Sequence, residues 1–254
     1  MLNIISAKKI NKLLNTPKKI KTVFSTTSTN TVLKNIYTSG KDLQVLISES
    51  QSKGKGRLNR TFYSPKFSGI YMSYRLSGNF EIESVGKITT LVAVAVAKAL
   101  EKLYNISVDI KWVNDLFINN KKVCGILCES VIIDNKLAGV IIGIGLNVYN
   151  KKFPIALQDI ATNLEKETSL KIDRNVIIAQ IINNLEDINA IINSQEYISE
   201  YKSRLFILGK QIKVITTNGE YLAKCIDLSP SGALIVEKDN EMLELVSGDV
   251  SIKI

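Results

Sequence analysis

Residues 108–148, with the sequence VDIKWVNDLFINNKKVCGILCESVIIDNKLAGVIIGIGLNV, decide the fold of this 254-residue chain. Short apolar runs alternate there with polar pairs, and the runs expected as strands are 108–113, 116–118, 123–133 and 137–148. The pairs Asn119-Asn120 and Asp134-Asn135 between them are of residue types that form tight turns readily. The stretch therefore predicts an antiparallel meander.

Helices are expected before and after this meander along the sequence. Ser84 to Tyr104 carries apolar residues at helical spacing and gives the strongest helix prediction in the chain. Another helix is expected after Ser28, a good N-cap, up to about Tyr37, with Gly40 as its stop. The remaining predictions are a short amphipathic helix over 3–15, a long helix over about 173–193, a shorter one to 205, and strands at 21–25, 43–48 and 70–76.

The tail of the chain has a different pattern from Phe206 onward. Five short β segments are separated by turn residues, which is typical of a small all-β barrel. The predicted domains are therefore 1–205 and 206–254. The predicted fold class is α+β, with a mixed or antiparallel sheet and flanking helices, followed by a small C-terminal β barrel.

Composition excludes several kinds of chemistry. The chain has no histidine, so no Ser-His-Asp or Cys-His apparatus and no imidazole metal site can form. The 33 Lys+Arg against 24 Asp+Glu give a net charge of +9, which indicates either an anionic partner or a lysine-rich solvated surface. Three cysteines and no signal-peptide pattern or bilayer-length apolar run indicate a reducing compartment without a membrane, so we expect the cytoplasm.

A glycine- and lysine-rich loop is the most informative local signal. In 53–60, KGKGRLNR, alternating glycines let backbone N–H groups approach an anion, and the interleaved Lys and Arg add positive charge. The spacing is neither that of a Walker loop nor that of a Rossmann fingerprint. Taken alone, the run could also be an exposed basic loop.

Three further segments carry polar residues at positions suited to a ligand. Lys111, Asn114, Asp115 and Lys122 can converge because a hairpin brings Lys122 back beside the Lys-Trp-Val-Asn-Asp run, although a charged hairpin around a core Trp has the same pattern. In 143–147, GIGLN, glycines two apart clear one face of a strand for a flat ligand, or simply pack in a crowded sheet. The third, Ser28-Thr29-Asn30, opens a helix and alone would be an ordinary N-cap.

In this order and spacing, the four segments together resemble the biotin protein ligases over about residues 25–150. The family's pattern is Ser-Thr-Asn, a Gln before a GRGRxxR loop that ends in Ser-Pro, KWPND, Lys-x-x-Gly-Ile-Leu-x-Glu, and GxGxN. The corresponding segments here are Ser28 to Asn30, Gln51, Gly54 to Arg60 with Ser64-Pro65, Lys111 to Leu116, Lys122 to Glu129, and Gly143 to Asn147. The departures are Lys55, Leu58, Asn59, Phe62 and Val113, of which Lys55 keeps the charge of the usual Arg without its planar fork.

The resemblance implies a class II synthetase-like catalytic domain followed by an SH3-like domain. Since the chain starts at the catalytic domain, we expect the monofunctional type without the N-terminal DNA-binding domain, and no DNA partner. Such enzymes activate biotin with ATP as biotinyl-5′-AMP and then transfer it to a lysine of a biotin carboxyl carrier domain. An ionised carboxylate is the first nucleophile, so the absence of histidine fits this chemistry. The resemblance allows a monomer or a homodimer.

The resemblance also implies roles for individual residues. Lys122 is the expected central catalytic residue, together with Arg57 on a loop that folds over the adenylate. Residues expected to bind biotin are Ser28, Thr29, Asn30, Gln51, Lys55, Gly56, Arg57, Lys122 and Gly125, with Gly143 in the pocket floor. Residues expected to bind ATP or the adenylate are Gly54, Lys55, Arg57, Arg60, Lys111, Asn114 and Asn147, with Asp115 as the Mg²⁺ carboxylate.

Other classes of function stay open at this point. A lipoate-type protein ligase uses the same adenylation logic, although the KGKGR loop and the KWxND motif are of the biotin type. A biotin-binding regulatory or nucleic-acid-binding protein would account for the +9 charge, but only 7% of residues are aromatic, which is few for base stacking. A non-catalytic binding module that uses the C-terminal barrel is the third alternative.

Overall fold

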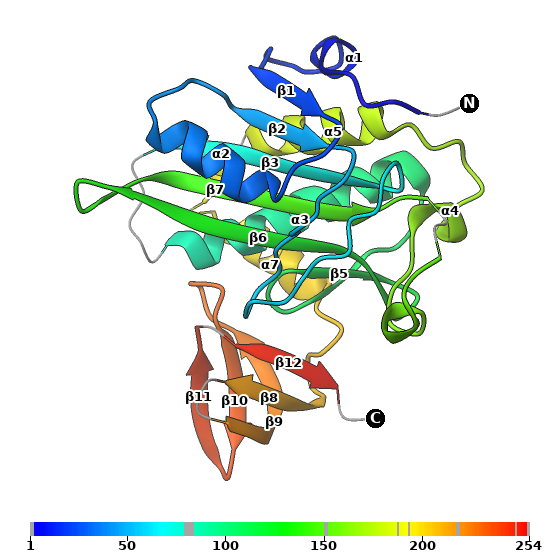
Figure 1. Cartoon of the computed structure of the whole chain (residues 1–254). Coiled ribbons are helices and arrows are strands. Elements are labelled where there is room, and N and C mark those ends of the chain that lie inside the picture. Colours follow the sequence, from blue (N-terminus) through cyan, green and yellow to red (C-terminus); the bar gives the residue numbers. More distant parts are fainter. Residues whose placement is uncertain are drawn as a thin grey trace.

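The main body is built on one seven-stranded mixed sheet, seen in the computed structural model of the chain (Figure 1). The structure describes residues 3–78, 84–149, 152–186, 188–192, 194–216, 219–246 and 248–252. The strands lie in the order β1-β2-β3-β7-β6-β5-β4. Their bounds are β1 Ile20–Val23, β2 Val45–Ser48, β3 Gly69–Ser77, β4 Asp109–Lys111, β5 Asp115–Ile118, β6 Lys121–Ile133 and β7 Lys136–Asn147.

The predicted meander is confirmed as strands β4 to β7. All neighbouring strands of the sheet are antiparallel except β1 and β2, which are parallel. Both turn pairs, Asn119-Asn120 and Asp134-Asn135, have positive φ at their two residues, between 49° and 61°. This conformation matches the right-handed twist of the paired strands, and asparagine and aspartate tolerate it better than most residues.

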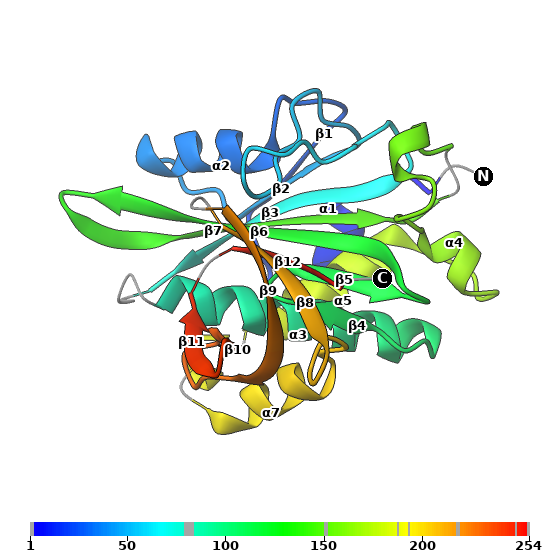
Figure 2. The ribbon, with the colours of Figure 1, turned by 90° about the horizontal axis from the view of Figure 1, so that it is seen from below.

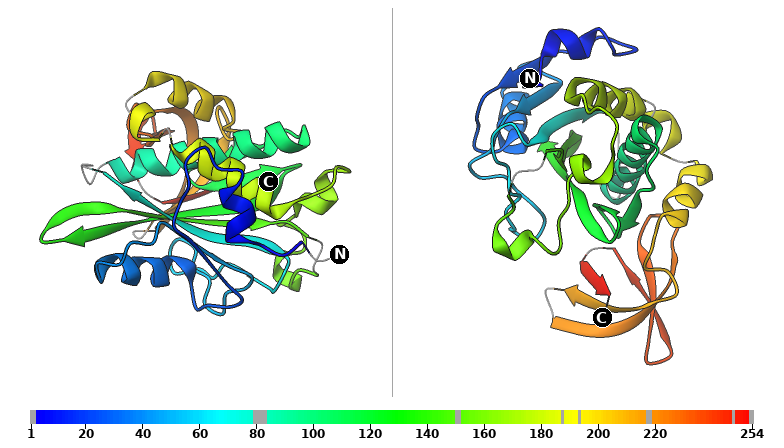
Figure 3. Two further views of the ribbon diagram at one scale, coloured as in Figure 1. Left: turned by 90° about the horizontal axis from the view of Figure 1, so that it is seen from above. Right: turned by 90° about the vertical axis from the view of Figure 1, so that its right-hand side faces the viewer.

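Helices cover both faces of the sheet, as Figure 2 shows from below and Figure 3 from above. Helix α2 lies on one face, and α3 and α5 lie on the other (Figure 2). The helix bounds are α1 Ala7–Asn11, α2 Thr29–Thr38, α3 Ser84–Tyr104, α4 Leu164–Glu167, α5 Arg174–Glu186, α6 Ile188–Ile191 and α7 Gln195–Ser203, with a 3₁₀ turn at Ile155–Leu157. The α3 prediction is confirmed residue for residue.

One helix prediction was wrong in extent. The N-terminal helix covers Ala7–Asn11 and not 3–15, because the Asn11 side chain bonds both the N–H and the C=O of Lys18 and turns the chain back. The long helix predicted over 173–193 is confirmed at Arg174–Glu186 and Ile188–Ile191, and residue 187 between them lies outside the described residues. Among the described residues, none of the helices has the length and apolarity that a bilayer crossing requires.

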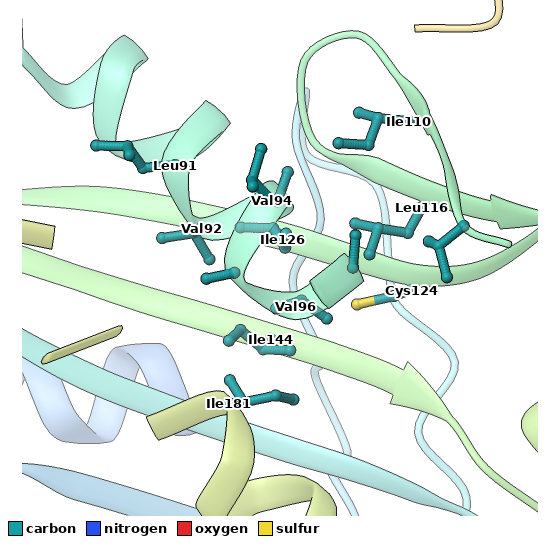
Figure 4. Packing of buried hydrophobic residues seen from close by; sticks show 14 of the residues in the cluster. Leu91, Val92, Val94, Val96, Ile110, Leu116, Cys124, Ile126, Ile144 and Ile181 are labelled. Atoms are coloured by element: carbon teal, nitrogen blue, oxygen red, sulfur yellow. The ribbon is translucent and has the colours of Figure 1, made fainter. Parts of the chain in front are cut away.

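The core lies between α3, α5 and the sheet. Figure 4 shows α3 side chains such as Val92 and Val96 facing Ile126 and Ile144 of the sheet, with Ile181 of α5 beside them. Thirteen of the 21 residues of α3 are buried, so this helix is apolar nearly all round and not only along one stripe. The buried cluster continues into the C-terminal strands, so both parts of the chain share one core.

The C-terminal part is a curved five-stranded antiparallel sheet in the order β11-β10-β9-β8-β12. Its strands are β8 Gln211–Thr216, β9 Gly219–Leu228, β10 Leu234–Lys238, β11 Glu241–Leu245 and β12 Asp249–Ile252. It is fastened to the main body by the indole N–H of Trp112, which donates to the Gly232 carbonyl at 3.0 Å. The only Trp of the chain therefore links the Lys-Trp-Val-Asn-Asp segment to the C-terminal part.

Candidate active site

A cavity of about 520 Å³ opens where the start of α2, the 51–62 loop and the β5-β6 hairpin come together. It collects most of the residues that the sequence nominated. These are Ser28, Thr29, Asn30, Gln51, Lys55, Gly56, Arg57, Arg60, Lys111, Asn114, Asp115, Lys122, Gly125 and Gly143. Two nominated residues do not line it: Gly54 borders a neighbouring hollow behind the loop, and the amide of Asn147 donates to the Thr162 carbonyl.

The basic loop is an ordered hairpin and not a slack segment. Lys55 and Thr61 form an antiparallel bridge, and Phe62 N–H donates to the Gly54 carbonyl at 2.9 Å. Leu58 and Asn59 occupy its tip with φ of 51° and 58°. A Cβ at Gly54 would lie 2.5 Å from the Phe62 carbonyl oxygen, so the close approach of the two arms requires glycine there.

Arg57 on this hairpin contacts two other parts of the molecule. Its guanidinium donates to Asn114 Oδ1 at 3.1 Å and to the Gly248 carbonyl at 2.6 Å. The loop, the Lys-Trp-Val-Asn-Asp segment and the C-terminal sheet are thereby joined at one cation, and Figure 1 shows the cyan loop descending in front of the main sheet toward the C-terminal strands. An anion bound in the cavity would compete with these neutral acceptors for the guanidinium.

Lys122 and Asp115 form an ion pair, with Nζ 2.7 Å from Oδ2, and both side chains are at most one-third exposed. The backbone of Lys122 is held on both sides, because its N–H donates to the Ile160 carbonyl and its carbonyl accepts from Thr162 N–H. A Cβ at Gly125 would lie 3.3 Å from Lys122 Nζ. Glycine at this position therefore leaves the ammonium its room in the cavity.

The far end of the cavity is lined by a chain of polar side chains. Gln51 Oε1 accepts from the N–H of Thr29 at 2.8 Å and from its hydroxyl at 3.1 Å. Gln51 Nε2 donates to Ser64 Oγ, which donates to the Phe62 carbonyl, each at 3.0 Å. Ser73 Oγ lies 2.8 Å from Thr29 Oγ1. These fixed hydrogen bonds give one end of the cavity a defined polarity.

Asn30 supports this end from beneath. Its side-chain N–H groups donate to the Leu127 carbonyl and to Glu129, and its Oδ1 accepts from Ser73. A Cβ at Gly143 would lie well inside contact distance of Asn30 Oδ1. Asn30 is thus a buried structural residue whose side-chain polar groups all have hydrogen-bond partners. Because Gly143 has no side chain, it leaves space for Asn30.

Sequence reasoning missed several residues of the site. The Phe62 ring covers Gly145, at which a Cβ would lie 2.6 Å from a ring carbon, and Leu157, Asp159 and Ile160 add a wall from a distant segment. In the sequence, Phe62 stands out only as a departure from the family's motif. The wall segment carries no motif, so only the parallel bridge of Ala161 to Lys122 reveals it.

Magnesium has a thin set of protein ligands here. Asp115 Oδ2 is occupied by Lys122, and its Oδ1 is buried without a hydrogen-bond partner. Within the described ranges, no three Asp, Glu, Cys or His side chains are grouped as a metal centre would require. The described residues therefore form no all-protein Mg²⁺ cage, and Asp115 stays the carboxylate that the resemblance assigns to Mg²⁺.

The cysteines near the site are structural. Burial raises the pKa of the Cys124 thiol and raises that of Cys128 to about 12. Because the thiolate is the reactive form, both groups stay protonated and unreactive at neutral pH.

Comparison with known proteins identifies the family of the chain. The model of the Biotin/lipoate A/B protein ligase family matches residues 23–147, and that of the Biotin protein ligase C terminal domain matches residues 207–253. The bifunctional ligase/repressor BirA of Bacillus subtilis is 31% identical over 218 residues, which cover 82% of this chain and 66% of BirA. The chain thus spans just under two thirds of that relative's length.

Two further relatives align over nearly their whole length. The biotin–[acetyl-CoA-carboxylase] ligase of Mycobacterium tuberculosis is 25% identical over 244 residues, or 92% of this chain and 88% of that protein. The structure of the biotin protein ligase of Aquifex aeolicus in complex with biotin and ATP superposes with a TM-score of 0.76 at 27% identity, covering 93% and 99% of the two chains. Since the matches span both the main body and the C-terminal sheet, the chain belongs to the biotin protein ligase family.

Proposed function

We propose that this protein is an ATP-dependent ligase that activates biotin as biotinyl-5′-AMP and transfers it to a lysine of a biotin carboxyl carrier domain. The observation that carries this proposal is one cavity lined by Lys122, by Arg57 of the hairpin, and by a polar end at Thr29 and Gln51. This polar end is called the ring pocket below. The Aquifex relative was solved with biotin and ATP, which supports the same two substrates here.

The first half-reaction needs positive charge and positioning more than a base. A carboxylate oxygen of biotin attacks the α-phosphorus of ATP, and pyrophosphate leaves with the electrons of the broken P–O bond. Lys122 is suited to bridge the carboxylate and the α-phosphate, because its ammonium is already held beside an anion in the cavity. Mg²⁺ enters as MgATP, where it neutralises charge on the phosphates.

The second half-reaction needs protection from water. The amine of the carrier lysine attacks the acyl carbon, AMP leaves with the electrons of the anhydride C–O bond, and the amine loses a proton. Before that step the adenylate can hydrolyse, so a closed Arg57 hairpin serves to exclude water. Arg57 is well placed for this because it reaches both Asn114 and the C-terminal sheet.

The domain limits and the compartment are part of the same proposal. We assign residues 1–205 to the catalytic domain and 206–254 to the C-terminal domain, which the family match at 207–253 supports. Asp115 is assigned to positioning Lys122, to which it is ion-paired, and Mg²⁺ is taken to arrive with ATP. The cytoplasm is the expected compartment, since ATP is the substrate and all three cysteines are free thiols.

A lipoate-type ligase is the nearest competing function, because the family model that matches 23–147 covers both kinds of enzyme. The ring pocket favours biotin. Thr29 and Gln51 present hydrogen-bonding groups that a ureido ring can satisfy and that the apolar dithiolane ring of lipoate would leave unpaired.

The test is incubation of the purified chain with biotin, MgATP and a biotin carboxyl carrier domain, followed by mass spectrometry of the carrier. The expected result is a mass increase of one biotinyl group on one lysine, absent without ATP. Lipoate in place of biotin is the matched control. Modification by lipoate and not biotin, or no adenylate from either acid, contradicts the proposal.

A further inference from the structure

The ring pocket has a donor and acceptor order that backbone groups impose. The Thr29 N–H can only donate, so the Gln51 atom beside it, 2.8 Å away, must be the amide oxygen. The Phe62 carbonyl can only accept, so the Ser64 hydroxyl proton points to it. Ser64 Oγ must then accept from Gln51 Nε2 at 3.0 Å. The Thr29 N–H and the Phe62 carbonyl, at the two ends of this series of hydrogen bonds, therefore require the same orientation of the Gln51 amide.

The hydrogen-bonding capacity left for a ligand follows by subtraction. Gln51 Nε2 gives one N–H to Ser64, so the amide has one N–H left to offer a ligand. Ser73 has one hydroxyl proton, and Asn30 Oδ1, which can only accept, takes it. Thr29 Oγ1 therefore does not accept from Ser73 and keeps lone pairs for a ligand. The pocket therefore offers a donor from Gln51 and, beside it, an acceptor from Thr29.

We propose that Ser64 is a positioning residue that fixes this polarity and thereby makes the pocket select a cyclic urea, whose C=O and N–H lie side by side. Ser64 is absent from the cavity lining and is itself buried, so it acts through Gln51. The proposal rests on the proposed function, since it takes biotin as the ligand. When a positioning residue is removed, the protein binds its ligand more weakly even though that residue does not touch the ligand.

A cyclic guanidine analogue of biotin tests the polarity directly. At neutral pH it presents N–H groups where biotin presents its carbonyl oxygen, so the remaining Gln51 N–H would face another donor. The wild-type protein is expected to prefer biotin in kcat/KM for biotin-dependent ATP–pyrophosphate exchange by on the order of 100-fold or more. Biotin and its guanidine analogue differ only where the carbonyl oxygen is replaced by nitrogen, so the comparison isolates the polarity of the ring pocket.

Ser64→Ala removes the acceptor that holds Gln51 Nε2. We expect the preference for biotin over the guanidine to fall by about tenfold or more, mainly through a higher KM for biotin, with the KM for ATP unchanged. Ser64→Thr keeps the hydroxyl and should restore the preference. A Ser64→Ala protein with the wild-type melting temperature and a preference within twofold of wild type would overturn the proposal.

Gln51→Glu is a second variant that does not depend on Ser64→Ala folding. A carboxylate at this position has no N–H and should move the preference toward the cationic guanidine, because opposite charges then meet in the pocket. An unchanged preference for biotin would overturn the polarity. A wild-type protein that activates neither compound refutes the proposed function itself, whereas a working enzyme whose Ser64→Ala variant keeps the wild-type preference refutes only the role of Ser64.

Discussion

Replacing Lys122 with Met should nearly abolish adenylate formation while the fold persists. The methionine side chain matches lysine as far as Cε and lacks the ammonium, which lies 2.7 Å from Asp115 Oδ2 in the free protein. The pair is partly exposed, so its loss should cost only about 1 kcal/mol of folding free energy. The transition-state charge is a different matter, because removing one fixed donor costs about 10²–10³ in rate, or roughly 3–4 kcal/mol.

The assay is biotin-dependent ATP–pyrophosphate exchange, with the melting temperature measured on the same samples. Lys121→Met is the matched control, since Lys121 is the neighbouring residue on β6 and does not line the cavity. We expect exchange at the wild-type level in the control and a loss of about 10²-fold or more in Lys122→Met. Near-normal exchange in Lys122→Met would remove Lys122 from its proposed role.

Combining Asp115→Asn with Lys122→Met tests whether Asp115 acts only through Lys122. If Asp115 serves only to hold Lys122, Asp115→Asn should reduce exchange by roughly tenfold in the wild-type background and have no effect beside Lys122→Met. If Asp115 holds Mg²⁺ independently, the two losses should multiply. Multiplying losses, together with a raised requirement for Mg²⁺ in Asp115→Asn alone, would refute the assignment of Asp115 to positioning.

Three further outcomes are expected. Arg57→Gly should let adenylate escape, measured as increased biotinylation of bystander proteins, and no increase over wild type would count against the hairpin as a lid. Gly143→Ala should push Asn30 from its place and lower the free energy of unfolding by about 1–3 kcal/mol while raising the KM for biotin; a change below half a kcal/mol would show that the strand gives way instead. Trp112→Phe should leave the Gly232 carbonyl without its donor and lower the melting temperature by about 2–6 °C, and an unchanged transition would mean that this bond does not fasten the C-terminal sheet.

Local patterns were enough to predict most of the elements. Helix α3 is set by its own apolar spacing, and the turns at Asn119-Asn120 and Asp134-Asn135 are set by residues that tolerate positive φ. These are interactions between near neighbours, which a sequence displays directly. The α1 prediction failed because the Asn11–Lys18 hydrogen bonds end the helix, and no periodicity records them.

The sequence by itself determined the elements, the motifs and the kind of chemistry, because the absence of histidine and the placement of Lys122 and the KGKGR loop are facts of composition and order. Only the tertiary structure decided what each polar group has left to offer a ligand. The side-chain hydrogen-bonding groups of Asn30 are engaged with Ser73, Leu127 and Glu129. Arg57 donates to the carbonyl of Gly248, which is 191 residues away in the sequence. Hydrogen bonds between distant residues depend on where the folded sheet places them, so neither spacing nor residue type reveals them in advance.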